Sequence, residues 1–418
     1  MPAKVERLAS ALAQGGAPLF FPDPPAPVTF NFDQGIAAEE TFPLEELKEL
    51  SARIIDRDEG RALEYISFDY DKANDDIIYI SSYIELVLGH TGMREQLAQW
   101  MGAKQGIDWL EADNYILTSG SVQAIAMAIN AFLDPGEGAL VEAASFPYAM
   151  RFMQMRGADM RAVEIDEHGM VPESLESRLK EFVADGVRPK FLYVIPTFQL
   201  PTGVVMPLKR RLRILELAEE YDLVVLEDNV YGDLRYEGEH LPTLLSLDRN
   251  GRVIQSSSFS KTVAPALRLG WMAGPKELIG ALAAVRQDLG TSQWTARLMA
   301  EFLAEGKLEP HIERANEVYR RKRDIAVETV REHCGEHVTF SVPEGAFYLW
   351  LALDESVDWE SAQRDASMAG VFCRPGEKFM GAEAGRGFLR IAFSHAPDHE
   401  LRRGLAALGK AIRDNVKQ

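Results

Sequence analysis

The sequence predicts an α/β fold in which a mostly parallel β-sheet, covered by helices on both faces, is accompanied by a smaller α+β domain. Short continuous apolar runs alternate with helical segments through the middle of the chain, which is typical of strands buried on both faces of a parallel sheet. From about Ala296 the pattern changes to one long helix dotted with charges, followed by further strands. A chain of 418 residues is long enough for two or three core units.

The order of these patterns predicts three parts. Residues 1–45 form an N-terminal arm and part of the small domain, residues 46–300 form the large domain, and residues 301–418 form the C-terminal small domain. Prolines between Pro22 and Pro27 prevent a helix there and predict an extended arm. Helical spacing begins at about Leu44.

The individual elements follow from the same reading. A second helix is expected over 91–104, after an acidic, tyrosine-rich loop at 68–83. The expected strands lie within 114–120, 138–144, 190–196, 222–228 and 251–257, with helices over 122–133 and 208–221 between them. The long helix covers 299–333, and strands of the small domain follow within 338–353 and 385–394.

Charge and cysteine content exclude several classes of function. Lys and Arg number 45 against 64 Asp and Glu, so the formal net charge of -19 repels phosphate backbones and anionic lipid. We therefore expect small-molecule partners, no nucleic acid and no membrane. Cys334 and Cys373 lack the spacing of a disulfide framework or a zinc site, which predicts no metal and a cytoplasmic protein. Glu6 and Arg7 interrupt what a signal peptide would need, and no apolar run approaches about 18 residues.

Lys261 is the first candidate for chemistry. It follows an apolar strand within IQSSSFSKTVAPALRLGW and has several hydroxyl neighbours and Arg268 nearby. A lysine in a partly apolar pocket can have its pKa lowered and form a Schiff base, while hydroxyls and an arginine can bind phosphate. The alternative is a serine-rich loop with a structural arginine.

Asp228 is the second candidate, because it ends a buried strand at the edge where open α/β sheets place their ligands. Its carboxylate could hold a proton on a heteroaromatic nitrogen, and Tyr231 could reach the same ligand. The alternative for Asp228 is a helix N-cap.

The third candidate is the strand, turn and helix start in ILTSGSVQAIAMAI. Backbone N–H groups of Ser121, Val122 and Gln123 at this helix N-terminus would form a phosphate cradle. The turn is neither a P-loop nor the GxGxxG of a dinucleotide-binding fold, so a nicotinamide dehydrogenase is not expected.

Together these candidates fit a phosphate-bearing pyridine aldehyde bound to Lys261, and at this point the sequence resembles a known family. It resembles the fold-type I pyridoxal-phosphate aminotransferases of class I/II, and more closely the subgroup of 2-aminoadipate, kynurenine and multi-substrate aminotransferases. The motifs that carry the resemblance are FDQGIAAEETFPLEEL, GHTGMREQLAQWM, ILTSGSVQA, VIPTFQLPTG, LEDNVYGDLRYEG, SSSFSKTVAPALRLGW, PEGAFYLW and FLRIAFS, in this order over nearly the whole chain.

The resemblance implies roles for the candidates. Lys261 would form the imine with pyridoxal 5′-phosphate and move the proton at the substrate carbon. Asp228 would pair with the pyridine nitrogen and Tyr231 with the cofactor's O3′ atom. Arg390, in FLRIAFS, would bind the substrate α-carboxylate through a bidentate contact. The alternative for Arg390 is a surface salt bridge.

Further residues would hold the cofactor. Ser258, Ser260 and Arg268 match the phosphate binders beside the cradle. Phe146 stands where the family usually has a ring-stacking tyrosine. Tyr83, with Tyr79 as its rival, would reach a phosphate across a homodimer interface, or either tyrosine could simply be packing.

The implied activity is transfer of an amino group from an L-amino acid to a 2-oxo acid by a ping-pong mechanism. The alternative on the same fold is a β/γ-replacement, elimination or oxidase enzyme of a biosynthetic pathway. A transcription regulator with an aminotransferase-like domain is a further rival, but we expect no DNA-binding module in the acidic residues before the first motif.

Leu200 departs from the family pattern. The family usually reads PTxQNPTG, and its asparagine donates a hydrogen bond to O3′, whereas this chain reads PTFQLPTG. Loss of a hydrogen bond to a partly charged oxygen costs roughly 1.5–3 kcal/mol if nothing replaces it. Asn229, beside Asp228, could compensate. A less stabilised oxygen predicts a raised pKa for the imine between Lys261 and the cofactor.

Leu200→Asn is expected to lower this imine pKa, because it restores the missing donor. A pH titration of the visible absorption band of the bound cofactor measures the change. An imine pKa that is the same in Leu200→Asn and the natural protein would contradict the interpretation.

Overall fold

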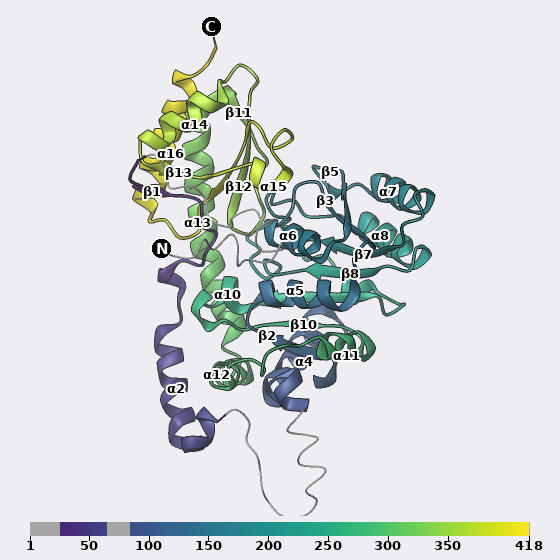
Figure 1. The fold of residues 1–418 in the computed structure, drawn as a ribbon. Coiled ribbons are helices and arrows are strands. Elements are labelled where there is room, and N and C mark those ends of the chain that lie inside the picture. The colour runs from purple at the N-terminus through teal and green to yellow at the C-terminus, as the bar shows by residue number, and fades with distance from the viewer. Residues whose placement is uncertain (1–25, 65–83, 418) are drawn as a thin grey trace, which may run out of the picture.

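The computed structural model describes residues 26–64 and 84–417, and its centre is a seven-stranded sheet (Figure 1). The strand order is β2-β10-β9-β8-β7-β3-β4. These strands are β2 (Tyr115–Thr118), β3 (Gly138–Glu142), β4 (Asp159–Val163), β7 (Pro189–Val194), β8 (Val224–Asp228), β9 (Val253–Ser258) and β10 (Gly270–Ala273). Adjacent strands from β4 to β9 are parallel, and β10 runs antiparallel to both of its neighbours. The predicted mostly parallel sheet is therefore confirmed.

Side chains of the sheet alternate between two apolar layers, as the period of a strand requires. In β7, Phe191 and Tyr193 belong to one layer, and Leu192 and Val194 belong to the other. The first layer contains α5 (Ser121–Phe132), α6 (Pro147–Arg156) and α11 (Lys276–Ala284). The second contains α4 (Thr91–Gln105), α7 (Pro172–Ala184), α8 (Leu208–Glu220) and α12 (Gln293–Ala304). Both faces of the sheet are thus buried, which is why its strands read as continuous apolar runs.

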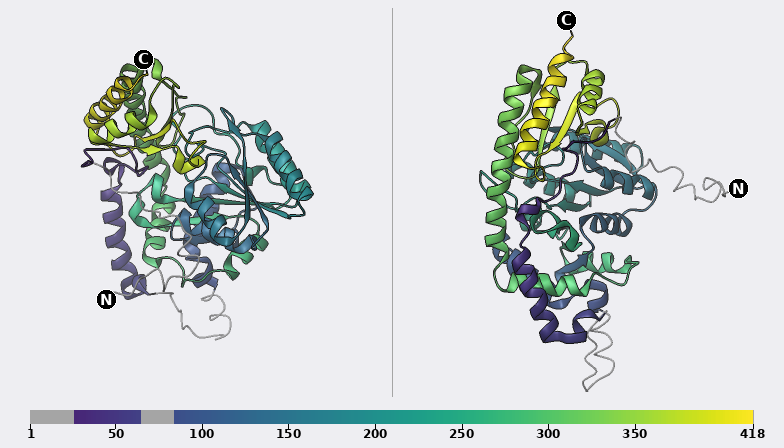
Figure 2. Two further views of the ribbon diagram at one scale, coloured as in Figure 1. Left: turned by 45° about the horizontal axis from the view of Figure 1, so that its top comes forward. Right: turned by 90° about the vertical axis from the view of Figure 1, so that its left-hand side faces the viewer.

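A smaller antiparallel sheet of order β11-β12-β15-β14 forms the second part of the fold, as predicted. Its strands are β11 (Val338–Thr339), β12 (Tyr348–Leu353), β14 (Arg374–Pro375) and β15 (Phe388–Ala392). The helices around it are α13 (Leu308–Cys334), α14 (Trp359–Met368), α15 (Glu377–Met380) and α16 (Asp398–Asp414), with α13 and α16 side by side (Figure 2).

The chain before the large sheet reaches both parts of the fold. β1 (Phe30–Asn31) pairs in parallel with β13 (Val371–Phe372) near the small sheet, and α2 (Leu44–Asp58) packs on α12. The helix predicted from about Leu44 is thereby confirmed, while most of the predicted proline-rich arm lies outside the described residues. The division of the chain at 45/46 and 300/301 stays a prediction.

Short 3-10 helices at Glu39–Thr41, Glu59–Leu63, Ala112–Asn114, Pro265–Leu267 and Gly335–His337, and four further short elements, connect these parts. The hairpin β5 (Ile165–Asp166) and β6 (Gly169–Met170) follows β4, α9 (Leu244–Leu247) precedes β9, and α10 (Phe259–Thr262) follows β9. Among the described residues, no helix combines the length and apolar character that crossing a membrane requires.

The single long helix expected over 299–333 is wrong, because two helices, α12 and α13, occupy this region. Gly306 separates them with φ +66°, a left-handed conformation that glycine adopts without steric cost. The N–H groups of Gly306 and Lys307 donate to the carbonyls of Leu303 and Phe302, which is the hydrogen-bond pattern of a Schellman cap. The wrong prediction arose because Gly306 lies between polar residues, so that the hydrophobic periodicity continues across the break.

Two glycines inside helices predict opposite effects of alanine on stability. At Gly404, in α16, an added Cβ would lie 2.6 Å from Cζ of Phe32 and 2.7 Å from Cγ of Phe30, whereas at Gly280, in α11, it would meet nothing within 4 Å. We expect Gly404→Ala to destabilise the protein by about 1–3 kcal/mol through overpacking. Gly280→Ala, its matched control, should stabilise by about 0.5–1 kcal/mol through helix propensity. Urea unfolding of both variants measures the difference, and two changes of the same sign would contradict it.

Candidate active site

The carboxyl edge of the large sheet brings the predicted residues of the central strands together. β8 ends at Asp228, and β9 ends at Ser258 and continues directly into α10, which carries Lys261. On the far side of β10, β2 ends at Thr118 and a turn at Gly120 leads into α5. Neighbouring strands that end at one edge place their following loops side by side, so residues more than a hundred positions apart share one site.

Lys261 lies partly buried at the centre of this arrangement. Its Nζ donates a hydrogen bond of 2.6 Å to the Gly35 carbonyl and lies 5.7 Å from the centre of the Tyr231 ring. Burial lowers the pKa of Lys261, and the positive charge of Arg390 acts in the same direction, while Tyr348 and Asp228 oppose the shift. The environment therefore favours the neutral amine more than water does.

Asp228 is buried and has one strong partner. The Tyr193 hydroxyl on β7 donates to its Oδ2 at 2.6 Å, while the Val230 N–H is 3.4 Å from its Oδ1. Burial raises the pKa of Asp228 to about 6, and the Tyr193 hydrogen bond and the charge of Lys261 act against this increase. No helix begins directly after Asp228, since the next one, α9, starts at Leu244. The alternative that Asp228 is a helix N-cap is therefore wrong.

A second buried carboxyl group, Glu142 at the end of β3, lies close enough to interact with Asp228 electrostatically. Its Oε2 accepts hydrogen bonds of 3.2 Å from the Ile195 N–H and the Gln199 side chain. Its Oε1 has no hydrogen-bond partner among the described residues. Burial raises the pKa of Glu142 to about 8, and the charge of Asp228 adds to the increase. Glu142 is therefore mostly neutral near pH 7.

The turn before α5 forms a pocket for an anion. The first N–H groups of α5, including those of Ser121 and Val122, have no acceptor within the helix. An added Cβ at Gly120, whose φ is +93°, would lie 2.6 Å from Nη2 of Arg268. The guanidinium of Arg268 contacts the Ser260 hydroxyl at 3.3 Å and the Ser119 carbonyl at 2.8 Å. The Ser260 hydroxyl and the guanidinium of Arg268 are thus two hydrogen-bond donors beside the helix N-terminus, and Arg268 adds a positive charge.

The side chains of Ser258 and Gln123 are engaged within the turn and the helix start, although only Ser258 was predicted to bind phosphate through its side chain. The Ser258 hydroxyl lies 3.2 Å from the Ser260 N–H that it caps and 3.1 Å from the Leu269 carbonyl. The Gln123 side chain accepts from the Ser119 N–H at 2.6 Å and donates to Asp288. In this structure Ser258 shapes the turn that positions Ser260, and the Gln123 side chain caps the turn before α5, while the role of its backbone N–H stays a prediction.

Arg390, on β15 of the small sheet, completes the site from the opposite side. It is 5% exposed, and its guanidinium lies between two rings, 4.5 Å from the centre of Tyr348 and 5.1 Å from that of Phe379. It donates to the Asp33 carbonyl, while its Nε has no partner among the described residues. Burial lowers the pKa of Arg390, and Arg374 contributes. The surface salt bridge considered for Arg390 is therefore wrong.

Tyr231 links the two halves of the site. Its hydroxyl oxygen lies 2.5 Å from that of Tyr348 on β12, and both residues are less than 5% exposed. Burial raises the pKa of Tyr231 well above its usual value, and the hydrogen bond to Tyr348 contributes. The phenol of Tyr231 thus stays protonated over the physiological pH range.

Comparisons with known proteins agree with this geometry. Residues 84–408 match the family described as aminotransferase class I and II. The chain is 32% identical to aromatic-amino-acid aminotransferase 1 of Thermococcus litoralis, over 92% of this chain and 88% of that protein. It is 31% identical to 2-aminoadipate transaminase of Thermus thermophilus, over 93% and 91%. A crystal structure of Pyrococcus horikoshii kynurenine aminotransferase in complex with PMP superposes with a TM-score of 0.88 at 30% identity, covering 100% and 99% of the two chains.

The chain belongs to the class I and II aminotransferases. The predicted fold-type I architecture, the aminotransferase activity and the pyridoxal 5′-phosphate cofactor are confirmed, and the comparisons do not favour the alternative of a replacement, elimination or oxidase enzyme.

The residues of this aminotransferase fit its cofactor. The cradle at Gly120 has the donors and the charge that a phosphate ester requires, and a methyl group there would collide with Arg268. A partly buried lysine and a buried carboxylate lie beside it, which are the groups that an aldehyde and a pyridine nitrogen need. The unsatisfied Nε of Arg390 is a donor available to a carboxylate ligand.

Phe146, Leu200 and Asn229 are further positions singled out from the sequence that the structure describes. Phe146 follows β3 at the same sheet edge, where its ring lies 5.3 Å from that of Tyr148. Leu200 is buried and offers no donor, and Asn229 packs against Gly232 with its Oδ1 unpaired within the described chain. Tyr83 and its rival Tyr79 lie outside the described residues.

Three residues of the site, Tyr193, Glu142 and Tyr348, were not predicted from the sequence. Tyr193 and Glu142 sit at the ends of apolar strands, so the carboxyl-edge rule that selected Asp228 could have found them. Tyr348 lies in PEGAFYLW, where an aromatic run reads as core packing, and no local signal in that run marks its contact with Tyr231.

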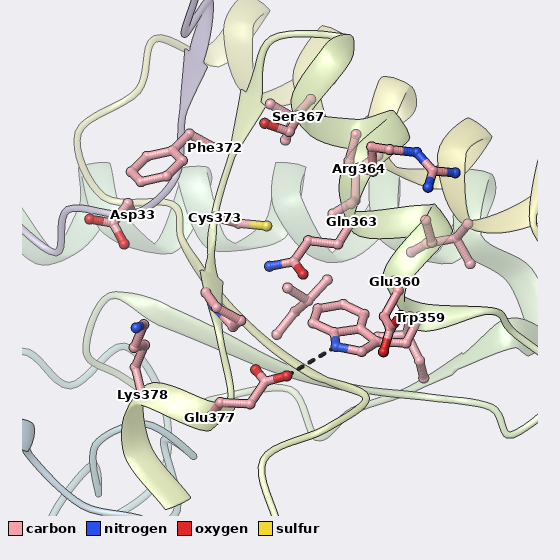
Figure 3. Close-up of a pocket in the computed structure, with 18 residues that line it drawn as sticks. Asp33, Trp359, Glu360, Gln363, Arg364, Ser367, Phe372, Cys373, Glu377 and Lys378 are labelled. Carbon is pink, nitrogen blue, oxygen red and sulfur yellow. Dashed lines mark hydrogen bonds between the residues drawn. The ribbon is translucent and has the colours of Figure 1, made fainter. Parts of the chain in front are cut away.

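A cavity of about 480 Å³ lies in the small domain rather than at Lys261 (Figure 3). It is lined by residues of α14, β13 and β14, with Asp33 and Lys378 at one end and Trp359 and Arg364 at the other. Asp33 connects it to the active site, because its carboxylate pairs with Arg374 at 2.5 and 2.6 Å and its carbonyl accepts from Arg390.

Glu142→Gln is expected to stabilise the cofactor-free protein at alkaline pH. Because the folded-state pKa of about 8 exceeds the usual 4.5, the folded protein binds this proton more tightly, and stability falls as the pH rises from about 4.5 to about 8. Glutamine keeps the shape and stays neutral. We expect a gain of roughly 3–5 kcal/mol at pH 8.5 and less than about 1 kcal/mol at pH 5, measured by urea unfolding.

The exposed Glu360→Gln is the control for this prediction, because its side chain is 73% accessible and makes only a surface ion pair with Arg386. It should change stability little at either pH. Equal destabilisation by Glu142→Gln at both pH values would show that Glu142 is needed as a carboxylate.

Proposed function

We propose that Lys261 is the amine that carries pyridoxal 5′-phosphate and that it transfers the proton at the substrate α-carbon during amino transfer from an L-amino acid to a 2-oxo acid. One observation carries this proposal. Lys261 and Arg390 come from the two different sheets, yet they bind carbonyls only two residues apart, those of Gly35 and Asp33. A substrate whose carboxylate is held by Arg390 would therefore present its α-carbon to Lys261.

The environment of Lys261 suits this work. A neutral amine is required both to add to an aldehyde and to accept a proton from carbon, and burial lowers the pKa of Lys261 in that direction. The Gly35 carbonyl accepts one hydrogen bond from Nζ and carries no formal charge. It fixes the direction of the side chain without stabilising the ammonium form as a carboxylate would.

Asp228 would hold a proton on the pyridine nitrogen. When bound, pyridoxal 5′-phosphate supplies an aldehyde for the amino group and a ring that delocalises the electron pair left on the substrate carbon. Tyr193 occupies Oδ2 of Asp228, so Oδ1, whose contact with the Val230 N–H is long, is the oxygen left for a cation. A positive charge there would counteract the burial that raises the pKa of Asp228.

The remaining groups would bind and orient. Ser121 and Val122 N–H groups, the Ser260 hydroxyl and Arg268 would hold the phosphate. The rings of Tyr348 and Phe379 pack against the guanidinium of Arg390, whose planar group would bind the substrate carboxylate by two parallel hydrogen bonds.

The substrate class we propose is aromatic L-amino acids. Tyr231, Tyr348 and Phe379 give the side of the site near Arg390 aromatic walls, which suit a large planar side chain. Relatives named for aromatic amino acids and kynurenine support this choice. We also propose a cytoplasmic homodimer with shared active sites, in which Tyr83 reaches the partner's cofactor. Two unpaired cysteines suit a reducing compartment.

A titration of the purified enzyme with single L-amino acids, in the absence of any 2-oxo acid, tests the function. We expect the yellow band of the bound cofactor to convert stoichiometrically to the pyridoxamine band, with an equal amount of 2-oxo acid released and fastest conversion by aromatic amino acids. A yellow band that persists while ammonia or another leaving group is formed would contradict amino transfer.

Lys261→Ala should abolish this conversion, with a loss of at least about 10²- to 10⁴-fold from the missing proton transfer alone. Lys180→Ala, a change of an exposed lysine in α7, is the matched control and should convert like the natural enzyme. Arg390→Lys should instead raise KM roughly 10- to 200-fold, because a lysine cannot replace the two-pronged contact.

A further inference from the structure

Two phenols meet at the boundary between the large and small sheets. Tyr231 follows β8 and Tyr348 begins β12, and their hydroxyl oxygens are 2.5 Å apart although the residues are 117 positions apart in the sequence. Their rings lie edge to face, with centres 5.6 Å apart. Within the described chain, each hydroxyl has only the other as its hydrogen-bond partner. One of the two protons makes this bond, and the other is available to a ligand.

The surroundings favour Tyr348 as the donor. The guanidinium of Arg390 lies 4.5 Å from the centre of the Tyr348 ring and draws electron density toward that face, which strengthens the hydroxyl as a donor. When Tyr348 donates to the Tyr231 oxygen, the proton of Tyr231 is directed elsewhere. Accepting a hydrogen bond from Tyr348 also makes the Tyr231 hydroxyl a stronger donor, because successive hydrogen bonds in a chain polarise one another.

Gln199, next to Leu200 in the sequence, does not supply the donor that this position lacks. Leu200 is 6% exposed and apolar, and the neighbouring Gln199 amide already donates to Glu142 and to the Ala144 carbonyl. Asn229 has its side chain against Gly232, where an added Cβ would lie 2.3 Å from its Oδ1. The Tyr231–Tyr348 pair, by contrast, is a hydrogen-bonded unit with one proton left for the cofactor's ring oxygen.

Gly35 provides the space that the phenol of Tyr348 occupies. An added Cβ at Gly35 would lie 1.8 Å from the Tyr348 hydroxyl oxygen, so only glycine allows Tyr348 to occupy this position. The Gly35 carbonyl is the acceptor of Lys261. The position of the Tyr348 hydroxyl is therefore fixed by the same residue that orients the lysine.

We propose that Tyr348 is a positioning residue that donates its hydroxyl proton to Tyr231, leaving the Tyr231 proton for the ring oxygen of pyridoxal 5′-phosphate and strengthening that remaining hydrogen bond where Leu200 offers no donor. This inference rests on the proposed contact of Tyr231 with the cofactor. Tyr348 acts through Tyr231 and does not itself touch the reacting atoms.

A double-mutant cycle with a spectroscopic readout tests the inference. The variants are Tyr348→Phe, Tyr231→Phe and the double variant, all loaded with pyridoxal 5′-phosphate, and the pH dependence of the visible absorption band gives the pKa of the bound chromophore. Tyr348→Phe keeps the ring against Arg390 and removes only the hydroxyl. We expect it to raise the chromophore pKa by roughly half to one unit, and Tyr231→Phe to raise it at least as much.

The double variant decides how Tyr348 acts. If it works through Tyr231, Tyr348→Phe should add nothing to Tyr231→Phe. Leu200→Asn introduced into Tyr348→Phe should bring the chromophore pKa back down. Tyr319→Phe is the matched control, because Tyr319 is also a buried phenol, with its ring centre 4.7 Å from that of Phe347. This change removes only the hydrogen bonds of the hydroxyl with Ala38 and Thr41. It should leave the chromophore pKa unchanged.

Each contrary outcome has one meaning. An unchanged pKa in Tyr348→Phe together with a raised pKa in Tyr231→Phe overturns the role of Tyr348 and leaves the proposed role of Tyr231 intact. Additive shifts in the double variant overturn the route through Tyr231. An unchanged pKa in Tyr231→Phe overturns the proposed contact of Tyr231 with the cofactor, and the inference falls with it.

Discussion

The hydrogen bonds from Lys261 and Arg390 to the carbonyls of Gly35 and Asp33 are the interaction on which the site depends. A single short segment binds the amine of Lys261, which follows the large sheet, and the guanidinium of Arg390 from the small sheet, and so sets the distance between the two. A carbonyl accepts a hydrogen bond from a buried donor without adding a formal negative charge. The guanidinium of Arg390 therefore keeps its attraction for an anionic ligand, and Lys261 is not held in its ammonium form as a carboxylate partner would hold it.

Burial governs the protonation of the whole site. It is the largest cause of the pKa shifts of Lys261, Asp228, Glu142 and Arg390, and it acts toward the neutral form of each. The fold opposes it selectively. Tyr193 supports the charged form of Asp228 by a short hydrogen bond, whereas Glu142 retains an oxygen without a partner within the described chain. Two carboxyl groups in one buried region are thus separated into a group that can carry charge and a group that is mostly neutral near pH 7.

The junction between the two sheets explains how this chain tolerates Leu200. The segment around Leu200 belongs to the large sheet, but the compensating phenol of Tyr348 that we propose comes from the small one. Such a replacement needs no change within the motif that lost its donor, since hydrogen bonds depend on position in space. It does require Gly35, because any side chain at that residue would displace the Tyr348 hydroxyl.

The sequence by itself determined the parallel sheet, most of its strands and helices, and the chemical candidates Lys261, Asp228 and Arg390. These follow from local signals: apolar runs, strand ends and motifs whose residues are neighbours in the chain. Only the tertiary structure decided that Tyr193 holds Asp228, that Tyr348 meets Tyr231, and that the expected long helix breaks at Gly306. Tyr193 and Asp228 are 35 positions apart in the sequence, and Tyr231 and Tyr348 are 117 apart. These contacts depend on the order of the strands and on the packing of the two sheets against each other, which hydrophobic periodicity does not predict.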